Sequence, residues 1–328
     1  MKLAIYNDTS PSGHAGCSCV MRVIESKIEK LELKKEYSWP YNVNWKLSKE
    51  LIKEVDVFII NGEGTLHHDD KGGGAYFIIG LIEYLLLQDK RVILVNSELY
   101  RLSDKALNTI SKCDFIGCRN RYSYNLINEF KDVREKSDFI YDYSLYYKFP
   151  KFRQETSGSS VVIDSVDSKE KSKLKTLSKE KKFPYVEMET FLTGIIFFRV
   201  FELPYVERIL FMLPSKVKVF VGRLIISRMS KVNHKRVISK FLRTIGKYEN
   251  VYTGRYHGML ISLKNNRIVW VESKMSKKFT NIVDDLNSKL DFLDQKNGRF
   301  IGLKLVKDID NREIDRQWDL INHVLNAS

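Results

Sequence analysis

The stretch Asp56-Val-Phe-Ile-Ile-Asn-Gly-Glu-Gly-Thr-Leu-His-His-Asp-Asp70 constrains the fold of this chain more than any other. Its apolar, β-branched run, Val57–Ile60, predicts a buried strand of a parallel sheet. A glycine triplet, Gly72-Gly73-Gly74, and an apolar segment, Ala75–Leu87, follow and predict a helix. Ligands of open α/β sheets bind at the carboxyl ends of strands, so the loop between this strand and this helix is a candidate site.

The composition of this loop suits an anionic ligand. Glycines let backbone N–H groups approach a ligand closely, and a glycine triplet at a helix start can cradle an anion. Two adjacent histidines and three carboxylates exceed what a turn requires, although a plain strand-turn-helix connection is the alternative. The candidate site residues of the loop are Asn61, Gly62, Glu63, Gly64, His67 and His68.

Alternating strands and helices predict a doubly wound parallel α/β domain over residues 1–150. The expected strands are Lys2–Asn7, Val57–Ile60, Arg91–Asn96, Phe115–Cys118 and Phe139–Ile140. The expected helices are Cys19–Leu31, Lys46–Glu54, Ala75–Leu87, Asp104–Lys112 and Tyr122–Phe130. Tyr37–Trp45 is aromatic and irregular, with no predicted element.

A second α/β domain is predicted over residues 158–328, after a polar, turn-rich linker at Phe149–Gly158. Its expected strands are Val161–Ile163, Val251–Thr253 and Arg267–Val271. Its expected helices are Lys169–Lys182, Val232–Ile245, Met259–Leu263, Phe279–Leu286 and Arg312–Leu325. In residues 191–229, apolar clusters alternate with basic residues, which indicates either a basic amphipathic membrane-surface element or a pair of core helices.

The charge of the chain favours acidic partners. The formal net charge is +14 and 43% of residues are hydrophobic, so a packed core is expected together with an anionic ligand, membrane or nucleic acid. The lysines are scattered and no zinc finger or ribonucleoprotein motif occurs, which disfavours nucleic acid. No apolar run is long enough to span a bilayer and nothing resembles a secretory signal, so we expect a cytoplasmic location, with contact to the inner face of the membrane as an alternative.

The four cysteines have no zinc-ligand spacing, and no metal site is predicted. Cys17-x-Cys19 is too tight for a zinc ribbon, and free thiols are expected in a reducing compartment. Cys17 lies in the polar loop after the first strand, which leaves a functional thiol there open. That loop also contains Asp8 and His14 but lacks a dinucleotide-binding GxGxxG spacing.

Thr253-Gly-Arg-Tyr-His-Gly258 forms a second candidate site at a predicted strand-to-helix junction. Arg255 offers a rigid fork of donors for a carboxylate or phosphate. His257 can donate or accept a proton near neutral pH. Gly254 and Gly258 leave room for a ligand at the helix N-terminus.

Several of these motifs, in this order, resemble the polysaccharide pyruvyl transferase family. The motifs are Asn61-Gly-Glu-Gly-Thr-Leu-His67, Arg119 with Ser123, Asp142, and Gly254-Arg-Tyr-His-Gly258, and the resemblance spans about Lys2–Leu286. It implies a GT-B-like fold of two facing Rossmann-like α/β domains with parallel sheets. It also implies transfer of a pyruvyl group from phosphoenolpyruvate to a pair of sugar hydroxyls of a cell-surface glycan, as a ketal. The first loop departs from the family's Asn-x-Gly-Asp pattern, so the acceptor stays open.

The resemblance assigns roles to the candidate residues. Residues 1–150 would form the acceptor side and part of the cleft, and residues 158–328 the donor side. His257 would protonate the donor, and Glu63 or His67 would act as base. Donor-binding residues would be Arg255, Arg119, Gly254, Gly258, Asn61, Gly62, Gly64 and Lys274, and acceptor-binding residues His14, Asp8 and His68.

Phosphoenolpyruvate would be a co-substrate, with no further cofactor and no metal. The expected partners are an anionic small-molecule donor and a saccharide acceptor, with a lipid-linked acceptor and peripheral membrane contact as one version. The alternative function is a GT-B glycosyltransferase that uses a nucleotide-activated, acidic sugar in envelope glycan synthesis.

Overall fold

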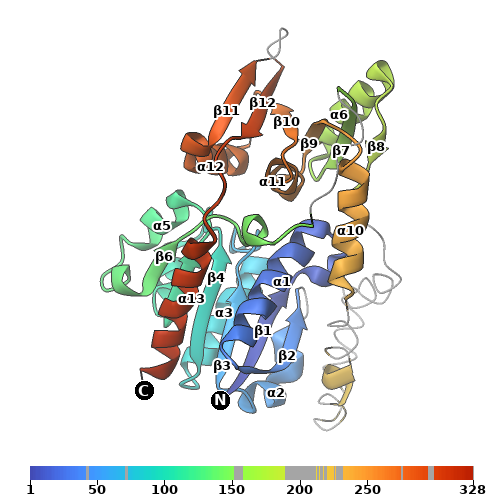
Figure 1. The fold of residues 1–328 in the computed structure, drawn as a ribbon. Helices are drawn as coiled ribbons and strands as arrows, with labels where there is room; N and C mark the ends of the chain where they lie inside the picture. Colours follow the sequence, from blue (N-terminus) through green and yellow to red (C-terminus); the bar gives the residue numbers. More distant parts are fainter. Residues whose placement is uncertain are drawn as a thin grey trace.

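A computed structural model describes residues 1–41, 44–70, 73–150, 158–188, 212, 214, 217, 220–224, 226, 232–274, 276–294 and 299–327. The described residues form two α/β halves, one above the other in Figure 1, each built on a six-stranded sheet. The carboxyl ends of the parallel strands in the two halves face each other across the junction, where residues 61–67 and 255–258 meet.

The N-terminal sheet has the strand order β2-β1-β3-β4-β5-β6, and all its pairs are parallel. Its strands are β1 (Lys2–Asp8), β2 (Lys34–Pro40), β3 (Val57–Asn61), β4 (Arg91–Ser97), β5 (Phe115–Cys118) and β6 (Ser137–Phe139). Its helices are α1 (Ala15–Lys30), α2 (Lys49–Lys53), α3 (Gly74–Leu86), α4 (Asp104–Ile110) and α5 (Arg121–Ile127). Short 3₁₀ turns occur at η1 (Ser10–Ser12), η2 (Trp45–Ser48), η3 (Arg134–Lys136) and η4 (Tyr143–Tyr146).

The C-terminal sheet has the order β11-β12-β10-β9-β7-β8, with an antiparallel hairpin at one edge. Its strands are β7 (Ser160–Ser165), β8 (Tyr185–Val186), β9 (Asn250–Gly254), β10 (Ile268–Glu272), β11 (Leu290–Asp294) and β12 (Phe300–Leu305). The helices of this half are α6 (Ser168–Lys181), α10 (His234–Ile245), α11 (Tyr256–Lys264) and α12 (Lys277–Leu286), and η5 spans Asn287–Lys289. The last helix, α13, spans Asn311–Asn326.

Strand burial explains why the sheet of the N-terminal half forms. Val57 and Ile59 of β3 face one layer with α1, and Phe58 and Ile60 face the opposite layer with α3. All four side chains are fully buried. Burying an aliphatic or aromatic side chain of this size contributes about 1.5–3 kcal/mol, which explains a strand that is apolar at every position.

The two halves share a topological feature that locates the ligand region. In the N-terminal half the strand order reverses between β1 and β3, and in the C-terminal half it reverses between β7 and β9. Ligands of open α/β sheets bind at the carboxyl ends of the strands at such a switch point. The predicted fold class is therefore confirmed, and both predicted motif loops lie at switch points.

The structure corrects three expectations about secondary structure and domain limits. The irregular stretch predicted at Tyr37–Trp45 overlaps the edge strand β2. The first half of β2, Lys34–Glu36, is charged, so the alternation of apolar and polar residues that marks a strand is missing there. The hairpin β11–β12 was not predicted. The closing helix α13, expected within 158–328, packs on the N-terminal half.

Three contacts fix α13 on the N-terminal half. Arg91 donates to the carbonyl oxygen of Val324 at 2.8 Å, and Arg316 donates to both carboxylate oxygens of Asp138 at 2.8 and 2.9 Å. Trp318 is buried in the same core as β1 and β3. The N-terminal half thus combines residues 1–150 with the last helix of the chain (Figure 1).

Most of the amphipathic segment 191–229 lies outside the described residues, as does the linker between 151 and 157. Two described residues of the segment contact the N-terminal half: Ile226 is buried beside its core and Arg223 donates to Glu54 at 2.8 Å. Membrane-surface contact stays a prediction. Among the helices that the structure describes, none combines the length and the apolar character needed to cross a bilayer.

Candidate active site at the junction of the two halves

The N-termini of two helices meet at the junction. Helix α1 follows β1 and helix α11 follows β9, so each begins at a switch point. The rings of His14, the N-cap of α1, and His257, in the first turn of α11, have centroids 5.5 Å apart. A Cβ added to Gly16 would lie 2.2 Å from the His257 Cβ, so only glycine allows this approach. The positive ends of two helix dipoles therefore point at one region.

Glu63 is held rigidly at the end of β3. Its Oε2 accepts hydrogen bonds from the hydroxyl of Thr9 at 2.7 Å and from the amide of Asn61 at 3.2 Å. The backbone N–H of Glu63 donates to Asn61 Oδ1 at 3.2 Å. Asn61 itself is completely buried, so it holds Glu63 in position and does not contact a ligand. The second oxygen of Glu63, Oε1, points across the junction.

His257 lies between two carboxylates from the opposite half. Its Nε2 is 3.5 Å from Glu63 Oε1 and 3.5 Å from Asp142 Oδ2. At those distances Nε2 has no hydrogen-bond partner among the described residues, although its side chain is only 8% exposed. Burial would raise the pKa of Asp142, but His257 and Arg119 together lower it below its usual value. The junction thus presents a buried imidazole nitrogen that a substrate or a transferred proton can engage.

Arg119 is part of a buried ion network. It forms salt bridges to Glu98 and, at 2.9 Å, to Asp142, and its guanidinium lies 4.6 Å from the centre of the Tyr256 ring. The side chain is fully buried, and its Nε lacks a partner among the described residues. Arg119 therefore orients the two carboxylates of this network.

Lys278 is the partly exposed cation of the site. Its Nζ lies 3.8 Å from Glu98 and 4.7 Å from the Tyr256 ring centre. It is also 3.4 Å from the position that a Cβ on Gly64 would occupy, and Gly64 has a positive φ of 57°. Partial burial and the nearby charge of Arg119 lower the pKa of Lys278 below its usual value.

Arg255 forms a bidentate pair with Asp164 at the end of β7. Arg255 Nε donates to Oδ1 at 3.0 Å and Nη2 to Oδ2 at 2.5 Å. Asp164 also accepts from the N–H of Met188 at 3.1 Å. Both side chains are buried, so the guanidinium is fixed at the N-terminus of α11, of which Arg255 is the N-cap residue.

Three predicted ligand glycines instead serve close packing. A Cβ on Gly62 would lie 2.2 Å from the Ser97 hydroxyl, and one on Gly254 would lie 2.5 Å from Glu170 and Ser165. A Cβ on Gly258 would lie 2.8 Å from the Thr253 hydroxyl. Among the predicted glycines, only Gly64 faces the cations.

Four other predicted site residues lie away from the Glu63–His257 pair. Asp8 is buried in its own loop, where it accepts from Ser38 at 2.7 Å and from the backbone and hydroxyl of Ser10. Such a satisfied carboxylate fixes the loop and offers little to an acceptor. His67 and His68 are exposed and contact each other, with their Nδ1 atoms 3.1 Å apart. Lys274 is exposed in the loop before α12, and Lys278, in the first turn of α12, is the lysine that lies near Glu98.

His14 and Cys17 lie beside His257 at the start of α1, and Cys17 also neighbours Glu63. The donor atoms of His14, Cys17 and His257 fall within 4.8 Å of one another, a spacing that a metal ion could use. Burial and the neighbouring Glu63 raise the pKa of the Cys17 thiol well above its usual value. Burial and the nearby His257 lower the pKa of His14 well below its usual value, so His14 is neutral at pH 7.

Sequence reasoning missed several residues of the site. They are Thr9, Glu98, Asp164, Tyr256 and Lys278. Glu98 and Asp164 could have been found, because each lies at the carboxyl end of an apolar strand, where a charged side chain needs a partner. Lys278 gave no such signal, because it stands among four lysines between 274 and 289.

Comparison with known proteins supports the fold and the family. Staphylococcus aureus MnaA, solved with UDP, shares 10% identity with a TM-score of 0.52 and covers 100% of this chain and 97% of its own. A Listeria monocytogenes structure assigned as a UDP-N-acetylglucosamine 2-epimerase gives the same values. At such low identity the likeness concerns the fold alone, which is GT-B-like.

No protein of curated function matches the chain. The family model for polysaccharide pyruvyl transferase matches residues 21–267, and the chain therefore belongs to that family.

Proposed function

We propose that this protein transfers a pyruvyl group from phosphoenolpyruvate to two hydroxyls of a saccharide, forming a ketal and releasing phosphate. The family membership supports the reaction class. The observation that carries the proposal for this chain is the meeting of the two helix N-termini at His257, beside Glu63 and Lys278. A small trianion with a phosphate and a carboxylate matches such a region.

The donor would bind at the N-terminus of α11. The first N–H groups of a helix have no intrahelical partner, and Arg255, the N-cap of α11, forms no side-chain cap to them. Arg255 and Lys278 add positive charge on either side of His257. The phosphate and carboxylate of phosphoenolpyruvate would therefore be held by backbone amides and these two cations, with the methylene carbon facing His257.

His257 and Glu63 would move the protons of the reaction. His257 Nε2 protonates the methylene carbon of the enol, which makes the adjacent carbon electrophilic. Glu63 takes the proton of the attacking saccharide hydroxyl, and the C–O bond of the first half of the ketal forms. The 3.5 Å between Glu63 Oε1 and His257 Nε2 lets that proton return to the imidazole.

The second hydroxyl then attacks the same carbon and the bond to phosphate breaks. One hydroxyl proton ends in the new methyl group and the other leaves with phosphate, so the reaction needs no oxidant or reductant. Phosphoenolpyruvate acts as a co-substrate in this scheme. The acceptor class is an envelope saccharide such as lipopolysaccharide, capsule or exopolysaccharide, free or lipid-linked.

Glycosyl transfer from a nucleotide-activated sugar is the second candidate. MnaA, which has the same fold, was solved with UDP, and helix N-termini with cations would suit a diphosphate equally well. Arg255 would then bind the diphosphate or a sugar carboxylate.

The test measures which donor is consumed. The protein is incubated with a panel of saccharide acceptors and either labelled phosphoenolpyruvate or labelled UDP- and CMP-sugars. We expect acceptor-dependent phosphate release and a new ketal methyl signal in the NMR spectrum of the product. Consumption of a nucleotide sugar without incorporation of pyruvate would establish glycosyl transfer instead.

Two histidine substitutions test the role of His257 in this assay. His257→Ala should lower turnover about 10²–10⁴-fold, the usual contribution of a positioned proton donor. His323→Ala, on the exposed face of α13, is the matched control and should retain wild-type turnover. Near-normal turnover of His257→Ala would remove His257 from the mechanism.

A further inference from the structure

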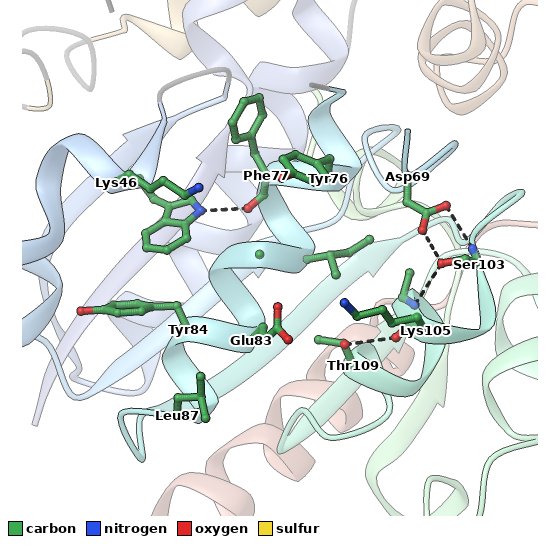
Figure 2. Close-up of a pocket in the computed structure, with 14 residues that line it drawn as sticks. Lys46, Asp69, Tyr76, Phe77, Glu83, Tyr84, Leu87, Ser103, Lys105 and Thr109 are labelled. Atoms are coloured by element: carbon green, nitrogen blue, oxygen red, sulfur yellow. Dashed lines mark hydrogen bonds between the residues drawn. The ribbon is translucent and has the colours of Figure 1, made fainter. Parts of the chain in front are cut away.

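A pocket of about 510 Å³ crosses the outer surface of α3, away from the His257 site. Figure 2 shows Lys46 and Tyr84 on one side of the helix, Ser103, Lys105 and Thr109 on the other, and Glu83 between them. Gly80 lies in the floor, and nothing in the described structure lies within 4 Å of a Cβ added there. The absence of a side chain at Gly80 therefore keeps the pocket open.

Aromatic rings line one end of this pocket. Trp45 stacks on Tyr84 with ring centres 4.9 Å apart and donates its indole N–H to the Phe77 carbonyl at 3.1 Å. Tyr76 is 39% exposed. Rigid rings beside hydrogen-bonding groups give a surface with an apolar body and a polar edge. Such a surface is complementary to a sugar ring, whose faces carry C–H groups and whose edge carries hydroxyls.

Several polar groups of the pocket have no partner within the described residues, and its lysines and carboxylates are balanced in number. The Tyr76 and Tyr84 hydroxyls, the Glu83 carboxylate and the Lys105 ammonium form no hydrogen bond or ion pair within the described residues. The lining includes two lysines, Lys46 and Lys105, and two carboxylates, Glu83 and Asp69, of which Asp69 accepts hydrogen bonds from Ser103. Such balance disfavours an anion or a nucleic acid and favours a neutral ligand rich in hydroxyls.

Two chain segments connect this pocket to the His257 site. Residues 63–69 and 98–103 run side by side: Tyr100 donates to Leu66 at 3.2 Å and His68 donates to Tyr100 at 3.1 Å. Both segments start in the site, at Glu63 and Glu98. Both end in the pocket wall, where the Ser103 N–H donates to Asp69 at 3.0 Å. Six residues of chain span at most about 20 Å, the reach of a short oligosaccharide.

Exposed planar side chains cover the surface between site and pocket. His67 and His68 are exposed, the His68 and Tyr100 rings have centres 5.6 Å apart, and Arg101 lies over the Tyr100 ring at 5.2 Å. His67 and His68, which do not contact Glu63 or His257, thus belong to the surface that joins the site to the pocket.

We infer that the pocket over Gly80 binds a distal part of the saccharide acceptor, whose chain runs along His67, His68 and Tyr100 to the reacting sugar at His257. The inference rests on the proposed function for the identity of the reaction, but the pocket's affinity for saccharide can be measured without any donor. The protein would accordingly prefer acceptors several sugars long over single sugars.

The test fills the pocket. Gly80→Leu places a branched side chain in its floor, and Tyr76→Ala removes an exposed ring without disturbing the core. Ser172→Leu, which adds the same side chain at an exposed position of α6, is the matched control. Fluorescently labelled wild-type protein and the three variants are applied, without donor, to an array of neutral oligosaccharides of two to eight sugars.

We expect wild-type protein and Ser172→Leu to bind the longer oligosaccharides, and Gly80→Leu and Tyr76→Ala to lose at least tenfold in affinity. In the transferase assay, the ratio of kcat/KM for long over short acceptors should fall at least tenfold in Gly80→Leu. Equal binding by wild-type protein and Gly80→Leu, or no binding of any arrayed saccharide, would overturn the inference. Saccharide binding without pyruvyl transfer would count against the proposed function alone.

Discussion

The two switch points of the molecule differ in charge. In the N-terminal half, Glu98 and Asp142 form salt bridges to one fully buried guanidinium, Arg119, and a third carboxylate, Glu63, lies beside His257. In the C-terminal half, one carboxylate, Asp164, accompanies Arg255, with His257 and Lys278 nearby. Similar topologies thus carry opposite charge, and under the proposed function the first half would accept protons and the second would bind the anionic donor.

The network of the N-terminal half should matter most for stability. Asp142→Asn keeps the shape of the side chain but leaves Arg119 buried with one carboxylate fewer. Removing one partner of a buried pair costs about 3–5 kcal/mol, which denaturant titration can measure. Asp310→Asn, at an exposed pair with Arg312, should cost far less, because solvent screens that pair. Similar costs for the two variants would mean that the loss of one carboxylate beside buried Arg119 does not destabilise the fold as expected.

The charge of the C-terminal half should matter most for donor affinity. Arg255→Ala removes positive charge from the N-terminus of α11 and leaves Asp164 buried without its bidentate partner. We expect binding of phosphoenolpyruvate to weaken by about 2–5 kcal/mol, measured by calorimetry, while acceptor affinity changes little. Arg312→Ala, whose guanidinium is exposed, is the control. Unchanged donor affinity in Arg255→Ala would contradict the division between the two halves.

Two lysines, Lys274 in the loop before α12 and Lys278 in its first turn, sharpen the same comparison. Lys278→Met should raise the KM for phosphoenolpyruvate about tenfold, because an ammonium beside the donor is worth roughly 1–2 kcal/mol in a partly exposed setting. Lys274→Met should leave this KM unchanged, since Lys274 is exposed and lies outside α12, in the loop before it. Equal effects of the two variants would mean that general basic charge, not position, attracts the donor.

The pH dependence of stability should show the smallest effect. The pKa of His14 is lowered by burial and by His257, so the unfolded state binds the proton more readily than the folded state. The free energy of unfolding should therefore fall as pH drops below about 6.5, by up to about 1.4 kcal/mol per pH unit for this histidine. His14→Asn keeps an N-cap acceptor for α1 and should flatten the slope in denaturant titrations between pH 5 and 7. An unchanged slope would show that other groups dominate.

The sequence by itself determined the alternation of strands and helices, because runs such as Val57–Ile60 can be buried only between two helical layers. It also determined two loops of the site, since Glu63 and His257 follow apolar strands in motifs rich in glycine. Edge elements escaped prediction: β2 and the hairpin β11–β12 are partly solvated, so their hydrophobic periods are weak.

Only the tertiary structure decided which of the candidate residues meet. Asp8 and Asn61 hold loops in place, and Gly62 and Gly254 are glycines because a neighbouring side chain occupies the space of a Cβ. Lys278, rather than Lys274, reaches the site because α12 presents one lysine of its first turn to Glu98. Distances between residues far apart in the chain depend on how the halves dock, and a linear pattern carries no information on that docking.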